Sequence, residues 1–372
     1  MIKPFYLDLE KSEIKDIQEK LGEILTSGQL ILGKYTEEFE EKFAKYIGSK
    51  YAVSMNSGTS ALEVLLRLKN AEGLKVAVPN NTNFASVAAI MRVNATPILM
   101  DMTKEYFVPD LNILKYTHKK NPDLSGVMWV HIGGIISPDF DKVVEYCKKN
   151  KIFLIEDAAH AHGSQFKGIK AGNFADGGAF SFFPTKVMTT MEGGMVTTNS
   201  KEDADLIKSF RNQGKRDGNF GGMHYDLGNS WRLSEIAAYI GIVQLEKLDR
   251  MIATRQSAVD KLMPVLDDMG LKYCDTSHMD NASQYKFIVR YNNNEPLRKI
   301  KENFINDGII LGGGVYESPI HEHPVFKDLD FDLEDLKTSV DLCPKHICPP
   351  ITSGTMAEDV DLIIDAFKKY LK

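Results

Sequence analysis

The stretch FDKVVEYCKKNKIFLIEDAAH, residues 140–160, leads from a helical pattern into a short apolar strand that ends on an acid. Apolar side chains repeat at helical spacing over residues 140–149, and residues 152–156 form a β-rich run. A helix followed by a buried strand is typical of the crossover units that join parallel strands of one sheet. We therefore expect this stretch to lie in a largely parallel sheet covered by helices.

The same alternation extends outward in both directions. Helical patterns lie upstream at residues 12–26, 37–47, 59–68 and 84–93, and β-rich runs lie at residues 75–79, 96–101 and 126–130. Downstream, residues 178–183 and 194–198 have strand character, and Lys186 lies in the turn region between them. We expect both of these runs to join the same sheet. The whole pattern predicts an α/β fold.

A second, smaller domain is expected in the last third of the chain. Residues 232–269 form one long helical pattern that can reach from the first domain into the second. Further strands are expected at residues 285–291 and 309–315, and helices at residues 296–306 and 356–370. We therefore expect a large domain over residues 1–248 and a small α+β domain over residues 249–372. The first helix, capped by Ser12, is a candidate to pack on the small domain.

Composition and charge exclude several classes of protein. The 372 residues are 43% hydrophobic, which suffices for more than one domain. The net charge of −6 arises from intermixed signs rather than blocks, so nucleic acid is not an expected partner. No apolar run approaches the roughly 18 residues needed to cross a membrane, and acids stand at the start where a signal peptide is apolar. We expect a cytoplasmic protein without a membrane segment.

The cysteines point to a reducing compartment. They are few and scattered, at Cys147, Cys274, Cys343 and Cys348. Two of them lie near His346, with His321 and His323 upstream, but this spacing matches none of the usual zinc ligand pairs. We expect buried thiols and no metal site.

The first chemical motif is a helix start rich in small residues, Ser57 to Leu62, which follows the strand-like residues 51–55. Its free amides, its hydroxyl groups and the positive end of the helix dipole suit a phosphate group, with Gly58 and Thr59 in the first turn. An ordinary capped helix start is the alternative reading.

Two further motifs follow strands. Asp157 stands at the carboxyl end of the run at residues 152–156, where open α/β sheets bind ligands, and its carboxylate could keep a pyridine nitrogen protonated. Lys186 follows residues 178–183 beside Phe182 and Phe183, which would partly desolvate it and favour the neutral amine that a Schiff base requires. Taken singly, these residues read as a helix cap and a surface lysine. Their order along the chain, after a phosphate-binding helix start, points to a cofactor.

These motifs resemble those of the DegT-type sugar aminotransferases, which share the three-layer fold type I architecture of aspartate aminotransferase. The resemblance covers nearly the whole chain. It also includes the segments Ile31-Leu32-Gly33, Phe39 to Phe43, Val130-His131, Gly168 to Asp176, Arg211 to Gly214, and Arg232 to Glu235.

The resemblance implies pyridoxal 5'-phosphate as the cofactor and assigns a role to several residues. Lys186 is similar to the lysine that forms the Schiff base, and Asp157 to the partner of the pyridine nitrogen. Ser181, together with Gly58 and Thr59, matches the phosphate ligands. His160 stands where the family often has Gln, near the phenolic oxygen, so its contact depends on which ring nitrogen carries the proton.

The chain departs from the family pattern at three places. Asn83 stands where an aromatic residue usually stacks on the cofactor, with Phe84 beside it. The phosphate-binding Asn that the neighbouring subunit donates aligns best with Ser230, one residue after Asn229. Thr185 and Val187 replace the more common neighbours of the lysine. A pocket completed by a second chain implies a homodimer with shared active sites.

The resemblance implies a two-step, ping-pong transfer of an amino group from L-glutamate to a keto or aldehyde sugar, with nucleotide-linked sugars as the first candidates for the acceptor. Tyr316 and His321, in a segment similar to the family's substrate-facing stretch, are candidate substrate-binding residues; a glycine turn and a surface loop are the alternative reading. Relatives that act as sugar dehydratases carry His in place of the lysine, so Lys186 argues against that reaction. A non-catalytic regulator of the same fold is the other alternative, against which Lys186, Asp157 and Ser181 together argue.

Overall fold

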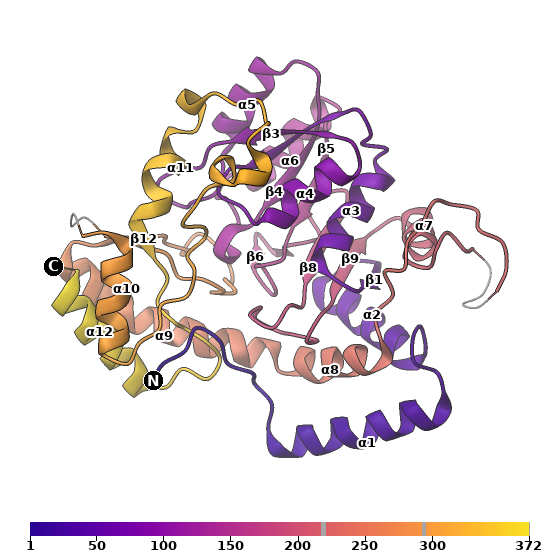
Figure 1. Ribbon diagram of the computed structural model, residues 1–372, viewed down its shortest axis with the longest axis horizontal. Coiled ribbons are helices and arrows are strands. Elements are labelled where there is room, and N and C mark those ends of the chain that lie inside the picture. The colour runs from indigo at the N-terminus through magenta and orange to yellow at the C-terminus, as the bar shows by residue number, and fades with distance from the viewer. Residues whose placement is uncertain (217–220, 292–294, 372) are drawn as a thin grey trace.

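In the computed structural model, a mixed sheet of seven strands forms the centre of the larger part of the molecule, counted over the described residues 1–216, 221–291 and 295–371 (Figure 1). In spatial order the strands are β1 (Tyr51–Met55), β9 (Gly194–Thr198), β8 (Gly178–Ser181), β5 (Phe153–Asp157), β4 (Leu124–Val130), β2 (Lys75–Pro79) and β3 (Thr96–Met100). Pairing is parallel from β8 to β3, whereas β9 runs antiparallel to β8 and to β1. The predicted largely parallel sheet is confirmed.

Helices cover both faces of this sheet. They are α2 (Lys34–Ile47), α3 (Gly58–Leu68), α4 (Phe84–Arg92), α5 (Leu111–Lys120), α6 (Phe140–Lys149), α7 (Lys201–Arg211) and α8 (Glu235–Glu246). Because successive side chains of a strand point to opposite faces, β4 sends Val127 and Trp129 into one apolar core and Met128 into another. The result is the three-layer α/β arrangement that the sequence predicted.

The smaller part of the molecule is built around a short antiparallel sheet. Its elements are α9 (Leu248–Met269), β10 (Lys272–Tyr273), β11 (Val289–Arg290), α10 (Leu297–Asn306), β12 (His346–Ile347) and α12 (Ala357–Tyr370). These helices and strands enclose an apolar core of their own. No helix among the described residues has the length and apolarity needed to cross a bilayer.

Two predicted elements of this region differ in the structure. The expected helix over residues 232–269 is two helices, since Lys247 leaves helical geometry between α8 and α9 and binds Asp8 and Glu13 with its ammonium group. The expected strand at residues 309–315 is irregular apart from one bridge, between Ile309 and Ile2. Its glycines, at residues 312–314, lower the propensity for a strand.

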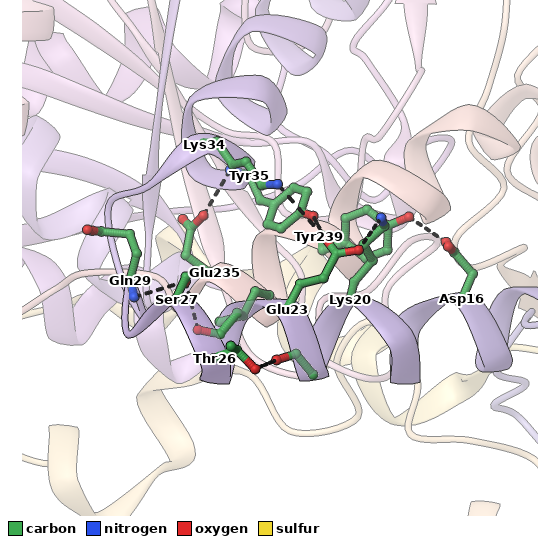
Figure 2. Close-up of polar contacts among 12 residues, drawn as sticks. Asp16, Lys20, Glu23, Thr26, Ser27, Gln29, Lys34, Tyr35, Glu235 and Tyr239 are labelled. Carbon is green, nitrogen blue, oxygen red and sulfur yellow. Dashed lines mark hydrogen bonds and ion pairs between the residues drawn. The ribbon is translucent and has the colours of Figure 1, made fainter.

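The first helix, α1 (Lys11–Ser27), lies along α8 rather than on the smaller part of the molecule (Figures 1 and 2). Asp16 accepts a hydrogen bond from the hydroxyl of Tyr239 in α8, and Glu23 accepts one from Tyr35 at 3.1 Å. These contacts hold the helix, which begins at a capping box of Glu10 and Glu13 instead of the predicted Ser12 cap.

A buried carboxylate joins two of the segments that carry the family resemblance, residues 31–33 and 232–235. Glu235 accepts hydrogen bonds from the amides of Gly33, Tyr35 and Thr36 at 2.9, 2.9 and 3.0 Å, so it satisfies the open amino end of α2 from 200 residues away. Figure 2 shows Glu235 beside Tyr35. The neighbouring Ser234 pairs with Ile31 in an isolated bridge. Segments 31–36 and 232–235 therefore form one structural unit.

Residues 320–342 return from the smaller part of the molecule to the sheet. Phe326 stacks on Phe84 with ring centroids 5.5 Å apart, and the amides of Thr338 and Ser339 both donate to Asp101 at 2.8 Å. Since Tyr316 lies just before this return, it stands where the two parts of the chain meet.

Candidate active site

A cavity of about 250 Å³ lies at the carboxyl ends of the central strands. It is lined by Ser57, Gly58, Thr59, Leu62, Thr82, Asn83, Ala85, Val130, Asp157, Ala159, His160, Ser181, Phe183, Lys186, Glu192 and Tyr316. A hollow of about 620 Å³ between β3, α5 and residues 330–338 is larger but contains none of the predicted site residues. The chemistry that the sequence predicts is thus gathered in the smaller cavity.

The start of α3 forms one wall of the cavity and abuts the end of β8. Ser57 caps the helix by accepting a hydrogen bond from the amide of Ser60 at 3.1 Å. A Cβ on Gly58 would lie 2.7 Å from Cβ of Ser181, and a Cβ on Gly194 would lie 2.2 Å from the carbonyl oxygen of Ser57. Only glycine fits at these two positions. Because neither residue has a side chain, the start of α3 can lie close to Ser181.

Asp157 ends β5 on the opposite side of the cavity. Its Oδ2 accepts a hydrogen bond from the hydroxyl of Ser86 at 2.8 Å, and its Oδ1 accepts one from the amide of Ala159 at 3.2 Å. Burial raises the pKa of this carboxyl group above its ordinary value, although the two hydrogen bonds and the charge of Lys186 oppose that change. A cationic N–H group placed against it would therefore gain a strong, desolvated acceptor.

The neighbouring Glu156 fixes the end of this strand. Its carboxylate accepts hydrogen bonds from the amides of Gly172, Phe174 and Ala175 at 2.7, 2.8 and 3.0 Å. This ties the resembling segment at residues 168–176 to β5 and holds the strand end on which Asp157 stands.

Lys186 is half-buried in the irregular segment that follows β8. Its amide donates to the carbonyl oxygen of Phe183 at 3.0 Å, and its Nζ lies 5.0 Å from the ring centroid of Tyr285. The hydroxyl groups of Thr185 and Tyr285 lie 3.2 Å apart, which joins the segment to the ring. The amine therefore reaches the cavity from a firmly held turn.

His160 connects the cavity to the smaller part of the molecule. Its Nδ1 accepts a hydrogen bond from the amide of Gly133 at 3.3 Å, and its Nε2 lies 3.3 Å from the hydroxyl of Tyr316. Burial lowers the pKa of this imidazole well below its ordinary value, and Lys186 and Lys286 lower it further. The ring is thus neutral, and since Nδ1 accepts, the proton lies on Nε2, which faces Tyr316.

Tyr285 and Tyr316 enclose this imidazole. The Tyr285 ring lies 4.3 Å from the His160 ring with an angle of 35° between the planes. Burial alone would raise the pKa of Tyr285, but the ammonium groups of Lys186 and Lys286 hold it below its ordinary value. Burial raises the pKa of Tyr316, next to Tyr285, whereas a hydrogen bond with Asn83 opposes the rise. Tyr316 remains protonated and is a hydrogen-bond donor.

Asn83 and Phe84 lie at the start of α4, where the family pattern is broken. Asn83 lines the cavity and accepts a hydrogen bond from the amide of Ala85 at 3.0 Å. Phe84 is turned away from the cavity and stacks on Phe326. Asn83, not Phe84, is therefore the residue of this pair that reaches the proposed cofactor position.

Three predicted site residues lie outside the lining of the cavity. His321 contacts Asn80 through Nδ1 at 3.0 Å and packs on Phe331, so its ring is held beside the end of β2. Asn229 and Ser230 lie in an exposed segment, and Ser230 accepts a hydrogen bond from Arg232 at 2.5 Å. Within one chain, these residues do not join the cavity.

Ser86 and Tyr285, which contact Asp157 and His160, were absent from the sequence prediction. Ser86 lies on α4, and the polar run at residues 80–83, directly after β2, was a signal that this strand end also faces a site. Tyr285 had no such signal, because an aromatic residue in an apolar run is the ordinary composition of a strand.

The cavity fits a cofactor that has a phosphate group at one end and a pyridine nitrogen at the other. The start of α3, with Gly58 and Thr59 in its first turn and Ser181 against it, suits the phosphate group. The buried carboxylate of Asp157 suits a protonated ring nitrogen, and Lys186 supplies an amine on the same cavity. These are the parts that pyridoxal 5'-phosphate requires.

Comparisons with known proteins agree with this geometry. The chain is 32% identical over 347 residues to GDP-perosamine synthase of Caulobacter vibrioides, with 91% of each chain covered. It is 35% identical over 264 residues to the UDP-4-amino-4,6-dideoxy-N-acetyl-beta-L-altrosamine transaminase of Campylobacter jejuni, which covers 69% of this chain and 67% of the relative.

Solved structures give the same result. A protein of Streptococcus pneumoniae assigned as a sugar aminotransferase, solved in a PLP form and a PMP form, superposes with a TM-score of 0.89 at 26% identity. The match covers 100% of this chain and 98% of that one. The family model described as the DegT/DnrJ/EryC1/StrS aminotransferase family matches residues 11–368. The chain therefore belongs to the DegT/DnrJ/EryC1/StrS aminotransferase family.

Proposed function

We propose that this enzyme transfers an amino group from L-glutamate to a keto or aldehyde sugar, with nucleotide-linked sugars as the first candidates. The observation that carries the proposal is the meeting of Lys186, Asp157 and the start of α3 in one cavity. The two relatives named above act on sugars linked to GDP and UDP by their names, which supports this class of acceptor.

Each residue has a distinct part in the proposed reaction. When bound, pyridoxal 5'-phosphate supplies an electron sink for the pair released at the α-carbon of the donor. Lys186 would hold the cofactor through its amine, and its free Nζ would accept the proton that the α-carbon of the donor releases. Asp157 holds a proton on the ring nitrogen, and Ser181, Gly58 and Thr59 hold the phosphate group.

We propose that His160 and Tyr316 orient the bound cofactor and do not transfer a proton. Because Nε2–H of His160 and the hydroxyl of Tyr316 lie 3.3 Å apart at the cavity, both can direct hydrogen bonds to oxygen atoms bound there. Asn83 completes this group of donors on the side of α4. We propose that these three polar side chains fix the plane of the bound ring in place of an aromatic stacking partner.

A homodimer with shared active sites is part of the proposal. Met223, Tyr225 and Leu227, just before Asn229 and Ser230, are 71%, 55% and 87% exposed, which is unusual for three apolar side chains so close together. Their exposure supports a role for this segment against a second copy, whose cavity would receive Asn229 or Ser230.

The test is the absorption spectrum of the purified protein during addition of L-glutamate without an acceptor. We expect the band of the bound cofactor to shift to that of pyridoxamine phosphate, with release of 2-oxoglutarate. Lys186→Ala should show no such shift, whereas Lys115→Ala, which changes a lysine above the ring of Tyr146 far from the cavity, should behave as the wild type.

A second addition then identifies the acceptor. The pyridoxamine form is mixed with keto-sugar nucleotides and with free keto-sugars, and return of the original band marks a substrate. A protein that binds the cofactor but responds to no amino donor contradicts the proposed function, and so does a protein that binds no cofactor.

A further inference from the structure

Lys286 places an ammonium group close to the cavity without a part in the function proposed above. Its amide donates to the carbonyl oxygen of Gly133 at 3.2 Å, and the amide of Gly133 donates to Nδ1 of His160 at 3.3 Å. One glycine therefore links the backbone of Lys286 to the imidazole. The contact that orients His160 also determines where Lys286 stands.

The ammonium groups of Lys286 and Lys186 lie around the same aromatic ring. Nζ of Lys286 is 5.4 Å from the ring centroid of Tyr285, and Nζ of Lys186 is 5.0 Å from it. Both charges lower the pKa of Tyr285 and of His160. Lys286 thus belongs to the same electrostatic environment as the proposed catalytic amine.

Lys286 has no anionic partner in the part of the chain that the structure describes. Its ammonium group makes a contact with the Tyr285 ring, and neither an ion pair nor a hydrogen bond to another described residue accompanies it. Two other half-buried lysines have carboxylate partners: Lys247 pairs with Asp8 and Glu13, and Lys301 pairs with Glu317. A half-buried ammonium group without a described counter-ion is able to bind an anion that a ligand supplies.

The ammonium group lies directly against the glycine-rich segment at residues 312–314. A Cβ on Gly312 would lie 3.1 Å from Nζ of Lys286 and 3.0 Å from Cβ of Pro4, whereas a Cβ on Gly313 would meet nothing within 4 Å. The segment then leads directly to Tyr316. Along the chain, Gly312 beside Lys286 is thus four residues from Tyr316, which lines the cavity.

We propose that Lys286, beside the glycine-rich segment, forms an anion subsite that binds an oxyanion of the substrate. The inference rests on the proposed function, which brings two such groups to the cavity: the carboxylates of an amino donor and the diphosphate of a nucleotide-linked sugar. Both present the charged oxygen atoms that an ammonium group binds. Lys286 would then determine the affinity for a substrate rather than the chemical step.

The test measures binding of unreactive probes to the holoenzyme by calorimetry. Glutarate carries two carboxylates and no amino group, and UDP and GDP carry the diphosphate without a sugar. We expect Lys286→Met to weaken either glutarate or the nucleotides by about tenfold or more, which identifies the source of the oxyanion. Lys286→Arg should restore most of the affinity, because it retains the charge.

Lys115→Met is the matched control, since Lys115 also lies above a tyrosine ring, 5.9 Å from the centroid of Tyr146, but far from the cavity. Its probe affinities should equal those of the wild type. Loss of affinity in Lys286→Met that Lys286→Arg does not restore would indicate packing of the side-chain stem and overturn the subsite. A wild-type protein that binds neither probe would also overturn it.

The two proposals can fail separately. If Lys286→Met binds every probe as the wild type does, while the wild type is converted by L-glutamate, the subsite is wrong and the aminotransferase proposal stands. If no amino donor changes the spectrum of the wild type, but Lys286→Met still loses probe affinity that Lys286→Arg regains, the subsite stands without that function.

Discussion

The hydroxyl of Ser86 donates a hydrogen bond to Oδ2 of Asp157 at 2.8 Å, so α4 holds the carboxylate at the end of β5. The same hydroxyl lies 2.8 Å from that of Thr82, which lines the cavity. This places a chain of two hydroxyl groups behind the acid. The orientation of Asp157 therefore depends on a residue 71 positions away in the sequence.

Replacing Ser86 by Ala should weaken the binding of pyridoxal 5'-phosphate. The carboxylate loses one donor, so its negative charge is less stable, and we expect a fall in affinity of about tenfold. Titration of the cofactor-free protein, followed by absorption, measures this. Ser125→Ala is the control, because its exposed hydroxyl binds only the carbonyl oxygen of Asp123. Equal affinity in Ser86→Ala and the control would show that the hydrogen bond does not support the site.

Replacing Asp157 by Asn should stabilise the protein without cofactor. Burial raises the pKa of Asp157 in the folded state above 3.8, so the folded protein retains a proton that the unfolded chain has lost. The free energy of unfolding therefore falls as the pH rises through this window. We expect cofactor-free Asp157→Asn to melt above the cofactor-free wild type at pH 8, with a smaller difference near pH 4.

With the cofactor bound, the order of the two melting temperatures should reverse, because Asn cannot supply the negative charge. Thermal unfolding of both proteins at pH 4 and pH 8, with and without cofactor, gives the melting temperatures to be compared. A variant that is destabilised equally at both pH values would contradict the proposed cost of the buried carboxylate.

Mild acid should destabilise the protein through His162. This imidazole is buried against Phe180 and Phe182, and burial lowers its pKa from 6.5 to about 3. Below pH 6.5 the unfolded chain gains a proton that the folded chain does not, so the free energy of unfolding falls as the pH falls towards 3. We expect His162→Leu to reduce this fall by up to about 1.4 kcal/mol per pH unit.

Urea unfolding at pH 7, 6 and 5 measures the slope. His224→Gln, at an exposed histidine, should keep the wild-type slope. If His162→Leu also keeps it, His162 is not the group that links unfolding to protons.

Two glycine substitutions should have opposite effects. A Cβ at residue 58 would lie 2.7 Å from Cβ of Ser181, so Gly58→Ala should push α3 from β8, lower the free energy of unfolding by about 1–3 kcal/mol and weaken cofactor binding. A Cβ at residue 22, in α1, would meet nothing within 4 Å. Gly22→Ala should therefore stabilise the protein by roughly 0.5–1 kcal/mol. Denaturant unfolding of both proteins measures these changes. Stabilisation by Gly58→Ala would contradict the close approach of α3 to β8.

The sheet and the lining of the cavity could be predicted because both follow local rules. Buried strands read as apolar runs, and parallel strands present their carboxyl ends at one edge, where Asp157 and the turn with Lys186 were expected together. Hydrogen bonds between distant segments leave no such pattern. Ser86 and Tyr285 are ordinary residues of a helix and an apolar run, and only the folded chain brings them against Asp157 and His160.

The incorrect predictions also have a physical cause. Residues 232–269 keep helical periodicity throughout, so the break at Lys247, which binds acids near the amino terminus, is a tertiary effect. The role of His321 in substrate binding stays a prediction; contacts with Asn80 and Phe331 hold its ring at the end of β2, outside the lining of the cavity. A local sequence pattern carries no information about such contacts with residues that are distant in the sequence.

The pairing of β1 with β9 has a consequence for how the chain is made. In the described residues β1 has β9 as its one neighbour in the sheet, with Tyr51 opposite Thr198. A ribosome therefore releases β1 roughly 7–30 seconds before the strand that completes it, at 5–20 residues per second. During that time an apolar strand has an open edge, which is a hazard for aggregation in a crowded cell.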